Sequence, residues 1–165
     1  MEPKTESLWY EFYKIIYPIS IVMEYVDNGD LLQRINELRQ TQRTMPEREV
    51  WMIFIQITMG LRAMHEKNVM HRDLKCANVF MNKDGRVKLG DMNVSKVANK
   101  KGLNFTQTGT PYYASPEIWL DKPYDIKSDV WSLGCVLYEI ITLYPPFQAD
   151  DMRGLYKKVI KGQYR

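Results

Sequence analysis

The sequence predicts an α+β fold that is mostly helical and contains a small amount of strand. Two stretches have the apolar spacing of long helices, one over residues 46–65 and one over residues 130–143. Between them, two short apolar runs flank a turn-forming cluster, which is the pattern of a β-hairpin over residues 79–89. A chain of 165 residues fits one domain and can bury a substantial core.

The composition is that of a soluble globular protein, with 45% hydrophobic and 26% charged residues. A net charge of +3 is too small to indicate a nucleic-acid or membrane partner. Residues 1–10 lack the apolar core of a signal peptide, and the run 130–143 is too short to span a bilayer. Cys76 and Cys135 are far apart, so we expect reduced thiols without metal or disulfide roles, and an intracellular, cytoplasmic location.

The first thirty residues contain one good strand candidate, Ile19–Tyr25, which is short, apolar and β-branched and ends at the loop cluster Asp27–Asp30. Trp9–Tyr13 is a second, weaker candidate. Taken alone, Asp30 is predicted to cap a helix over Leu31–Arg39. A ligand contact is the alternative for this residue, and the two roles can coexist.

The next helix is predicted to begin near Glu47, with Thr44 and Glu47 as a possible capping box. One apolar stripe runs along it at steps of four and three residues: Val50, Phe54, Ile57, Leu61 and Met64. Trp51, Ile53 and Ile55 widen the stripe, which predicts burial on more than one side.

Pairing of the hairpin strands is expected to bring polar residues from its two ends together in a small site. Its turn is Asn82–Gly85, and antiparallel pairing of the two flanking runs folds Asn78 back beside Asp91. Two hard oxygen ligands that face the loop carboxylate of Asp73 fit a Mg²⁺–phosphate site.

Two helices are predicted after a long polar segment that extends from Asp91 to Glu117. A segment of this length is usually functional or disordered. The helix that begins at Asp129 is apolar nearly all round and therefore central to the core. Met152–Lys161 is predicted to be an amphipathic helix with its apolar residues inward, namely Leu155, Val159 and Ile160.

The run His71-Arg72-Asp73-Leu74-Lys75-Cys76-Ala77-Asn78 resembles the catalytic loop of protein kinases. Asp91 stands at the place of the metal-binding aspartate of the family's DFG motif. The stretch Gly109–Glu117 looks like the end of a kinase activation segment, with Ser115 where alanine is usual. A motif of six residue types at fixed spacing is expected by chance at roughly one start position in 10⁷. An incidental charged loop could account for any one of these residues, but it does not account for all of them together.

The resemblance implies a protein-kinase-like fold, mostly the helical large lobe with a remnant of the small-lobe sheet. On this reading residues 1–26 are partial small-lobe strands and the hinge, and residues 27–165 are the large lobe without its final helices. The motif Gly-Thr-Pro-Tyr-Tyr-x-Ser-Pro-Glu with Asn78-Val79-Phe80 is most similar to the NIMA-related (Nek) kinases. Lys75 fits a serine/threonine kinase, which transfers phosphate from Mg-ATP to hydroxyls of protein substrates.

The resemblance also implies a role for each residue of the loop. Asp73 would orient the substrate hydroxyl and accept its proton. Lys75 would stabilise charge on the γ-phosphate, and Asn78 and Asp91 would hold Mg²⁺. On the nucleotide side, the residues implied are Met23 as gatekeeper, the backbone of Glu24 and Val26 for adenine, Asp30 near the ribose, and Phe80 below the adenine.

Further implied roles are regulatory and structural. Arg72 offers a positive fork for a phosphate on Thr106, and Thr110 would hydrogen-bond the catalytic loop. The structural residues are His71, Glu117 and Asp129, with Asp129 bracing the catalytic-loop backbone. In kinases the equivalent of Glu117 pairs with an arginine from the final helices, so its carboxylate is expected to be unpaired here. His65 is expected to be a capping or packing residue.

Three departures from the family pattern are found, one of them the expected lack of the final helices after Arg165, and the missing upstream elements leave a second function open. The DFG triplet reads Asp91-Met92-Asn93, and no glycine precedes Gly29, so we expect no glycine-rich phosphate loop in this chain. Lys4 and Lys14 lie too close to Met23 to be the phosphate-pairing lysine. The alternative is therefore a non-catalytic, pseudokinase-like binding module. The sequence predicts neither substrate nor oligomeric state, and only the resemblance points to a centrosome or cilium.

Overall fold

The structure is a computed structural model, and it describes residues 24–91, 96–97 and 111–164. Trp9–Tyr13 and most of the strand predicted over Ile19–Tyr25 lie outside the described residues. Glu24 and Tyr25 are described, and they are not in a strand.

The described elements are mostly helical, which confirms the predicted α+β class. The strands form two antiparallel pairs, β2 with β3 and β1 with β4. In chain order the elements are α2 (Leu31–Gln40), α3 (Glu47–His65), β1 (Val69–Met70), the 3₁₀ turn η1 (Cys76–Asn78), β2 (Val79–Met81), β3 (Val87–Leu89), β4 (Lys96–Val97), α4 (Pro116–Trp119), α5 (Ile126–Thr142) and α6 (Met152–Lys161).

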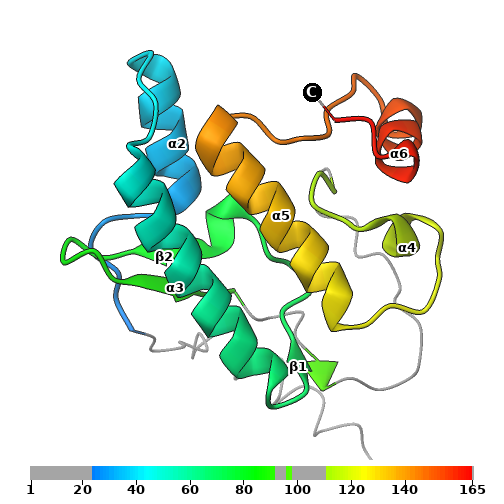
Figure 1. Cartoon of the computed structure of the whole chain (residues 1–165), viewed down its shortest axis with the longest axis horizontal. Helices are drawn as coiled ribbons and strands as arrows, with labels where there is room; N and C mark the ends of the chain where they lie inside the picture. The colour runs from blue at the N-terminus through cyan, green and yellow to red at the C-terminus, as the bar shows by residue number, and fades with distance from the viewer. Residues whose placement is uncertain (1–23, 92–95, 98–110, 165) are drawn as a thin grey trace, which may run out of the picture.

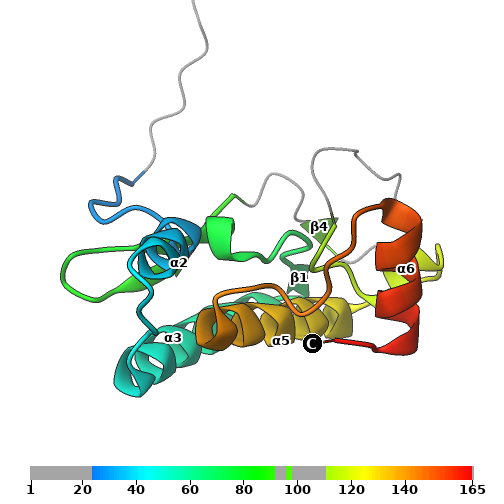
Figure 2. The ribbon, with the colours of Figure 1, turned by 90° about the horizontal axis from the view of Figure 1, so that it is seen from above.

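Helix α5 runs through the middle of the molecule, with α3 beside it (Figures 1 and 2). Helix α2 and the β2–β3 hairpin lie at one end of this pair, and α4 and α6 lie at the other. The main core fills the space between α2, α3, α5 and η1, and its most buried residues include Leu31, Ile35, Ile57, Val136 and Ile140. A second cluster joins α5 to α6.

Helix α2 begins where the sequence predicts. The Asp30 carboxylate accepts a hydrogen bond from the Gln33 backbone N–H at 2.9 Å, which confirms the predicted cap. Its other oxygen accepts from the Gln33 side chain at 2.8 Å. Leu31, Ile35 and Leu38 recur at helical spacing and turn into the core.

Two predictions for α3 are wrong. The N-cap is Pro46 and no side chain caps the helix, so Thr44 lies too far upstream to form a capping box with Glu47. Trp51 and Ile55 are each 51% exposed, because α3 packs against α5 and the hairpin on one side only. Ile53 is buried, as predicted.

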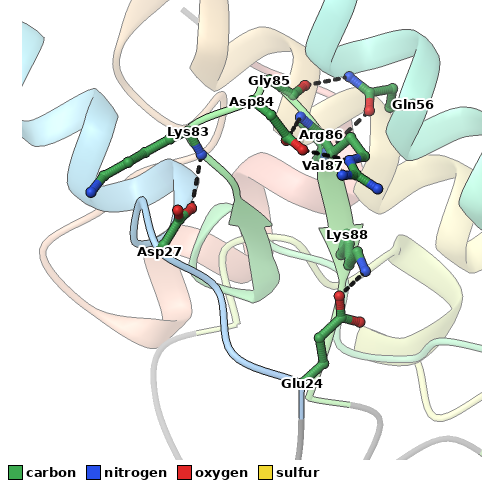
Figure 3. A network of polar contacts seen from close by, with 9 residues as sticks. All are labelled: Glu24, Asp27, Gln56, Lys83, Asp84, Gly85, Arg86, Val87 and Lys88. Atoms are coloured by element: carbon green, nitrogen blue, oxygen red, sulfur yellow. Dashed lines mark hydrogen bonds and ion pairs between the residues drawn. The ribbon is translucent and has the colours of Figure 1, made fainter.

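The predicted hairpin is confirmed. Strands β2 and β3 pair with Val79 opposite Leu89, and the Gly85 N–H donates to the Asn82 carbonyl at 3.0 Å. Gly85 has a φ of +82°, a backbone conformation that glycine adopts without steric cost. Asp84 stiffens the turn by accepting hydrogen bonds from Arg86 (Figure 3).

A glutamine on α3 ties the helix to this hairpin, and the sequence analysis did not find it. The Gln56 amide nitrogen donates to the Gly85 carbonyl at 3.0 Å, and its oxygen accepts from the Val87 N–H at 3.0 Å (Figure 3). The side chain therefore pairs with the backbone as another strand would, and it fixes the hairpin against α3.

We expect Gln56→Leu to lower the free energy of unfolding by about 1–2 kcal/mol, because two half-buried backbone groups lose their partners. The measurement is urea unfolding followed by circular dichroism. Gln40→Leu is the matched control, because Gln40 is an exposed residue of α2. Equal stability of both variants would contradict the role given to Gln56.

Helix α6 is close to the prediction, whereas α5 begins at Ile126, three residues before the predicted start at Asp129, and also differs in burial. Helix α6 spans Met152–Lys161, with Leu155 and Val159 buried. Helix α5 contributes to both core clusters, but Val130 and Ile141 are more than half exposed, so it is not buried all round. None of the helices in the described ranges is long and apolar enough to cross a membrane.

Candidate active site

A buried carboxylate on α5 holds the loop between β1 and η1. Asp129 is 1% exposed, and its side chain accepts hydrogen bonds from the backbone N–H groups of His71 (2.9 Å) and Arg72 (2.8 Å). The Nε2 atom of His65 lies 2.8 Å from the same carboxylate. Asp129 therefore contacts the backbone of the loop that it was expected to brace, and His65 contacts Asp129.

The backbone turns sharply at Arg72, which has a φ of +69°. Its guanidinium lies 5.7 Å from the centroid of the Tyr124 ring, within the range of a cation–π contact. The neighbouring His71 is fully buried. Burial lowers the pKa of His71 and outweighs the carboxylates of Asp129 and Asp73, which act to raise it.

Asp73, Lys75 and Asn78 come together as predicted. Lys75 Nζ lies 2.7 Å from Asp73 Oδ2, and Asn78 Nδ2 donates to the same oxygen at 2.9 Å. Asn78 Nδ2 also donates to the Asp73 main-chain carbonyl at 2.8 Å. The 3₁₀ turn η1 makes this possible, because it curls the chain so that residue 78 returns to residue 73.

The hairpin brings Asp91 to the same end as Asn78. The Gly90 N–H donates to the Asn78 carbonyl at 3.0 Å, so the residue before β2 lies beside the residues after β3. Gly90 packs so tightly on Phe80 that an added Cβ would lie 2.5 Å from its ring. Asp91 is exposed and has a φ of +55°.

Asn78 and Asp91 carry the oxygens expected to hold a metal ion, and Asn78 is at this end of the hairpin. Both donor bonds of the Asn78 amide group point to Asp73, so its carboxamide oxygen faces away from Asp73. Among the described residues there is no group of three or more His, Cys, Asp or Glu that could hold a metal. A pair of oxygen ligands completed by phosphate and water is the coordination that Mg²⁺ commonly has in nucleotide sites.

The residues expected on the nucleotide side are partly described. Met23 lies outside the described residues. Asp30 pairs with Phe80 in an isolated bridge, and the backbone of Asn28 and Gly29 hydrogen-bonds Met81 (3.1 and 2.9 Å). This segment therefore runs alongside β2, which brings Asp30 and Phe80 together.

Glu24 and Val26 continue that segment. Glu24 is exposed and forms an ion pair with Lys88 of β3 (Figure 3), and Val26 is half-buried. Their backbone groups make none of the hydrogen bonds found within the described part of the chain.

Thr106 and Thr110, the two regulatory candidates, lie outside the described residues. Glu117 is described: it makes none of the ion pairs found in the described residues, and Ser128 Oγ donates a hydrogen bond to its carboxylate at 2.7 Å. Burial acts to raise the pKa of Glu117, but hydrogen bonds, led by that of Ser128, outweigh it and hold the pKa below the usual value. Ser115, fully buried, donates to Ser128 at 3.0 Å and extends this chain of contacts.

Three polar residues of α5 hold the segment before α4, and the sequence analysis missed this role. Ser128 contacts Ser115 and Glu117, while Ser132 Oγ donates to the Tyr113 carbonyl at 2.9 Å. Glu139 accepts a hydrogen bond from the Tyr113 hydroxyl. Polar residues at steps of four and seven on an otherwise apolar helix are the signal that marks such a face.

A cavity of about 690 Å³ lies elsewhere, between the ends of α5 and α6. Its walls include Tyr138, Tyr144 and Tyr164. It contains none of the residues of the Asp73 cluster, so the cluster and not the cavity is the candidate site.

Comparison with known proteins agrees with this geometry. The family model of the protein kinase domain matches residues 8–165. The chain belongs to the protein kinase family. Among curated relatives, serine/threonine-protein kinase Nek3 of Mus musculus is 46% identical over 143 residues, and Nek5 of Homo sapiens is 46% identical over 146 residues. The probable serine/threonine-protein kinase nek2 of Dictyostelium discoideum is 39% identical over 147 residues.

These matches cover 86–87% of this kinase chain but only 28%, 20% and 35% of the respective relatives. The chain is therefore similar to one part of each Nek protein. The predicted resemblance to Nek kinases is confirmed, and so is the kinase fold.

Proposed function

We propose that this chain forms the catalytic part of a serine/threonine protein kinase, which transfers the γ-phosphoryl group of Mg-ATP to a protein hydroxyl. The observation that carries the proposal is the Asp73 carboxylate, whose Oδ2 lies 2.7 Å from Lys75 Nζ and 2.9 Å from Asn78 Nδ2. Phosphoryl transfer mainly requires positioning of the reactants and stabilisation of charge. The carboxylate of Asp73, the ammonium of Lys75 and the carboxamide of Asn78 can provide both, because they lie together in one short loop.

Each residue of the cluster has a distinct task. Asp73 orients the substrate hydroxyl and takes its proton, and the two donors on its Oδ2 fix the carboxylate for that purpose. Lys75 is one third exposed, so its ammonium can contact a phosphoryl oxygen that approaches from solvent. The loop holds these positions because Asp129 anchors its backbone.

Asn78 and Asp91 are the residues that would hold Mg²⁺. The ion would supply charge neutralisation to the phosphates of ATP. Asn78 contributes its carboxamide oxygen, and Asp91 contributes its carboxylate from the end of β3. Phe80, packed on Gly90 and next to Asp30, offers an apolar surface for the adenine.

The direct test is transfer of labelled phosphate from ATP to a generic protein substrate such as casein. Because no glycine precedes Gly29, the assay compares the chain alone with the same chain joined to the glycine-rich loop, lysine and final helices of a Nek relative. We expect transfer to serine and threonine by the completed domain and little by the chain alone. Nucleotide binding by the completed domain without transfer would instead favour the non-catalytic binding module.

Arg72 is proposed to receive a phosphate carried by Thr106. Its guanidinium lies beside Tyr124, and its Nε atom is buried without a hydrogen-bond partner in the described part of the chain. We expect Thr106→Ala to lower kcat of the completed domain about tenfold or more, because the activation segment loses the charge that pairs with Arg72. Thr108→Ala is the matched control. Full activity of the Thr106→Ala domain would rule out this regulation.

A further inference from the structure

Among the residues that the structure describes, the most buried ionisable side chain outside the loop and its anchor is that of Glu139, in the second half of α5. It is 3% exposed, and it accepts hydrogen bonds from the Tyr113 hydroxyl and from the Cys76 thiol, the latter at 3.5 Å. These three residues come from three parts of the chain. Cys76 is the first residue of η1 in the catalytic loop, and Tyr113 lies just before α4. Glu139 belongs to α5 and contacts both.

Both donors keep their protons. Burial, together with the Glu139 carboxylate, raises the pKa of the Cys76 thiol well above its usual value. Burial also raises the pKa of Tyr113, and the neighbouring Cys76 and Glu139 add to the effect. The thiol is fully buried and protonated, so it is a hydrogen-bond donor and neither a nucleophile nor a metal ligand.

The Glu139 carboxylate links the catalytic loop to the segment at residues 111–117, because it accepts a hydrogen bond from each. The main-chain carbonyl of Tyr113 is already held by Ser132 at 2.9 Å, so α5 fixes the backbone of this residue. Its hydroxyl end is held by Glu139, which also binds Cys76, three residues after Asp73. A shift of the segment at residue 113 is therefore transmitted to the loop that carries the proposed base.

We propose that Cys76, Tyr113 and Glu139 form a junction that holds the segment at residues 111–117 in register with the catalytic loop, and that Cys76 is a positioning residue for the protein substrate. This inference rests on the proposed kinase function. The nucleotide-side residues are held by different contacts, namely the β2–β3 ladder and its bridge to Asp30. The junction links the catalytic loop to the segment at residues 111–117 and makes no hydrogen bond to Asp30 or Phe80 among those found in the described residues, so we expect its effect on the protein substrate to exceed its effect on ATP.

The junction itself is tested by a double-mutant cycle on the chain, with urea unfolding as the readout. Cys76→Ala and Tyr113→Phe each leave Glu139 one donor, whereas the double variant leaves a buried carboxylate with neither. We expect the double variant to lower the urea midpoint by more than the sum of the single shifts. Tyr156 of α6 is the matched control, because its hydroxyl makes no hydrogen bond among those found in the described residues and it lies outside the junction. Cys76→Ala combined with Tyr156→Phe should therefore be additive, and additivity in both cycles would overturn the junction.

The positioning role is tested in the completed kinase domain. We expect Cys76→Ala to raise KM for the protein substrate about three- to tenfold, the value of one hydrogen bond, with KM for ATP unchanged. Cys76→Ser keeps a donor and should restore most of the affinity. Equal changes in both KM values, or a serine variant no better than alanine, would overturn the role. If the completed domain transfers no phosphate, the substrate role fails with the proposed function, while the unfolding cycle still decides whether the junction exists.

Discussion

Asp73→Asn is expected to lower kcat of the completed kinase domain by about 10²–10⁴-fold, the usual contribution of a general base. A carboxamide cannot take the proton of the substrate hydroxyl. Its nitrogen would also face Lys75 Nζ or Asn78 Nδ2, both donors that now point at Asp73 Oδ2. The measurement is the initial rate of phosphate transfer to casein at saturating ATP.

The matched control for this variant is Asp84→Asn in the hairpin turn. Asp84 is an exposed carboxylate that contacts only Arg86 in the described structure. We expect its domain to keep the rate of the unmodified protein. Circular dichroism should show that both variants fold. Equal transfer by the Asp73→Asn domain and the unmodified one would reject Asp73 as the base.

Asp129→Ala is expected to produce the largest loss of stability, roughly 3–5 kcal/mol of the free energy of unfolding. The substitution leaves the buried N–H groups of His71 and Arg72 without an acceptor and removes the partner of His65. Since a domain of this size is stable by about 5–15 kcal/mol, the variant is expected to be near its unfolding threshold at 37 °C.

Urea unfolding of the chain measures this loss, and Asp125→Ala provides the comparison. Asp125 caps the same helix four residues earlier, and its side chain accepts one hydrogen bond from the Lys127 N–H at 2.8 Å. Loss of an exposed cap costs about 1 kcal/mol. If the two variants lose similar stability, the carboxylate of Asp129 does not hold the loop as described.

The sequence predicted correctly those elements that are determined by interactions between residues close in sequence. The Asp30 cap, the turn at Asn82–Gly85 and the amphipathic helix Met152–Lys161 all depend on neighbours within a few residues, and all three are confirmed. The meeting of Asp73, Lys75 and Asn78 followed from the loop motif, and the return of Gly90, the residue before Asp91, to Asn78 followed from hairpin pairing.

Features that depend on distant partners could not be predicted. The spacing of Trp51 and Ile55 indicates an apolar face but not whether another element covers it, and in this structure both are half exposed. Gln56 and Glu139 look like ordinary polar residues of helices until the hairpin and the loops are placed against them. A helix periodicity alone does not show which polar residue will meet a backbone group.

The left-handed backbone at Arg72 has a consequence for how this loop can be altered. An L-residue with a φ of +69° is disfavoured by roughly 1–2 kcal/mol relative to a right-handed one, whereas glycine adopts this conformation freely. Arg72→Gly would therefore ease the fold while deleting the guanidinium. At this position the backbone conformation favours glycine, whereas the proposed phosphate contact needs arginine. If that proposal is correct, Arg72→Gly should be more stable and should not respond to phosphorylation of Thr106.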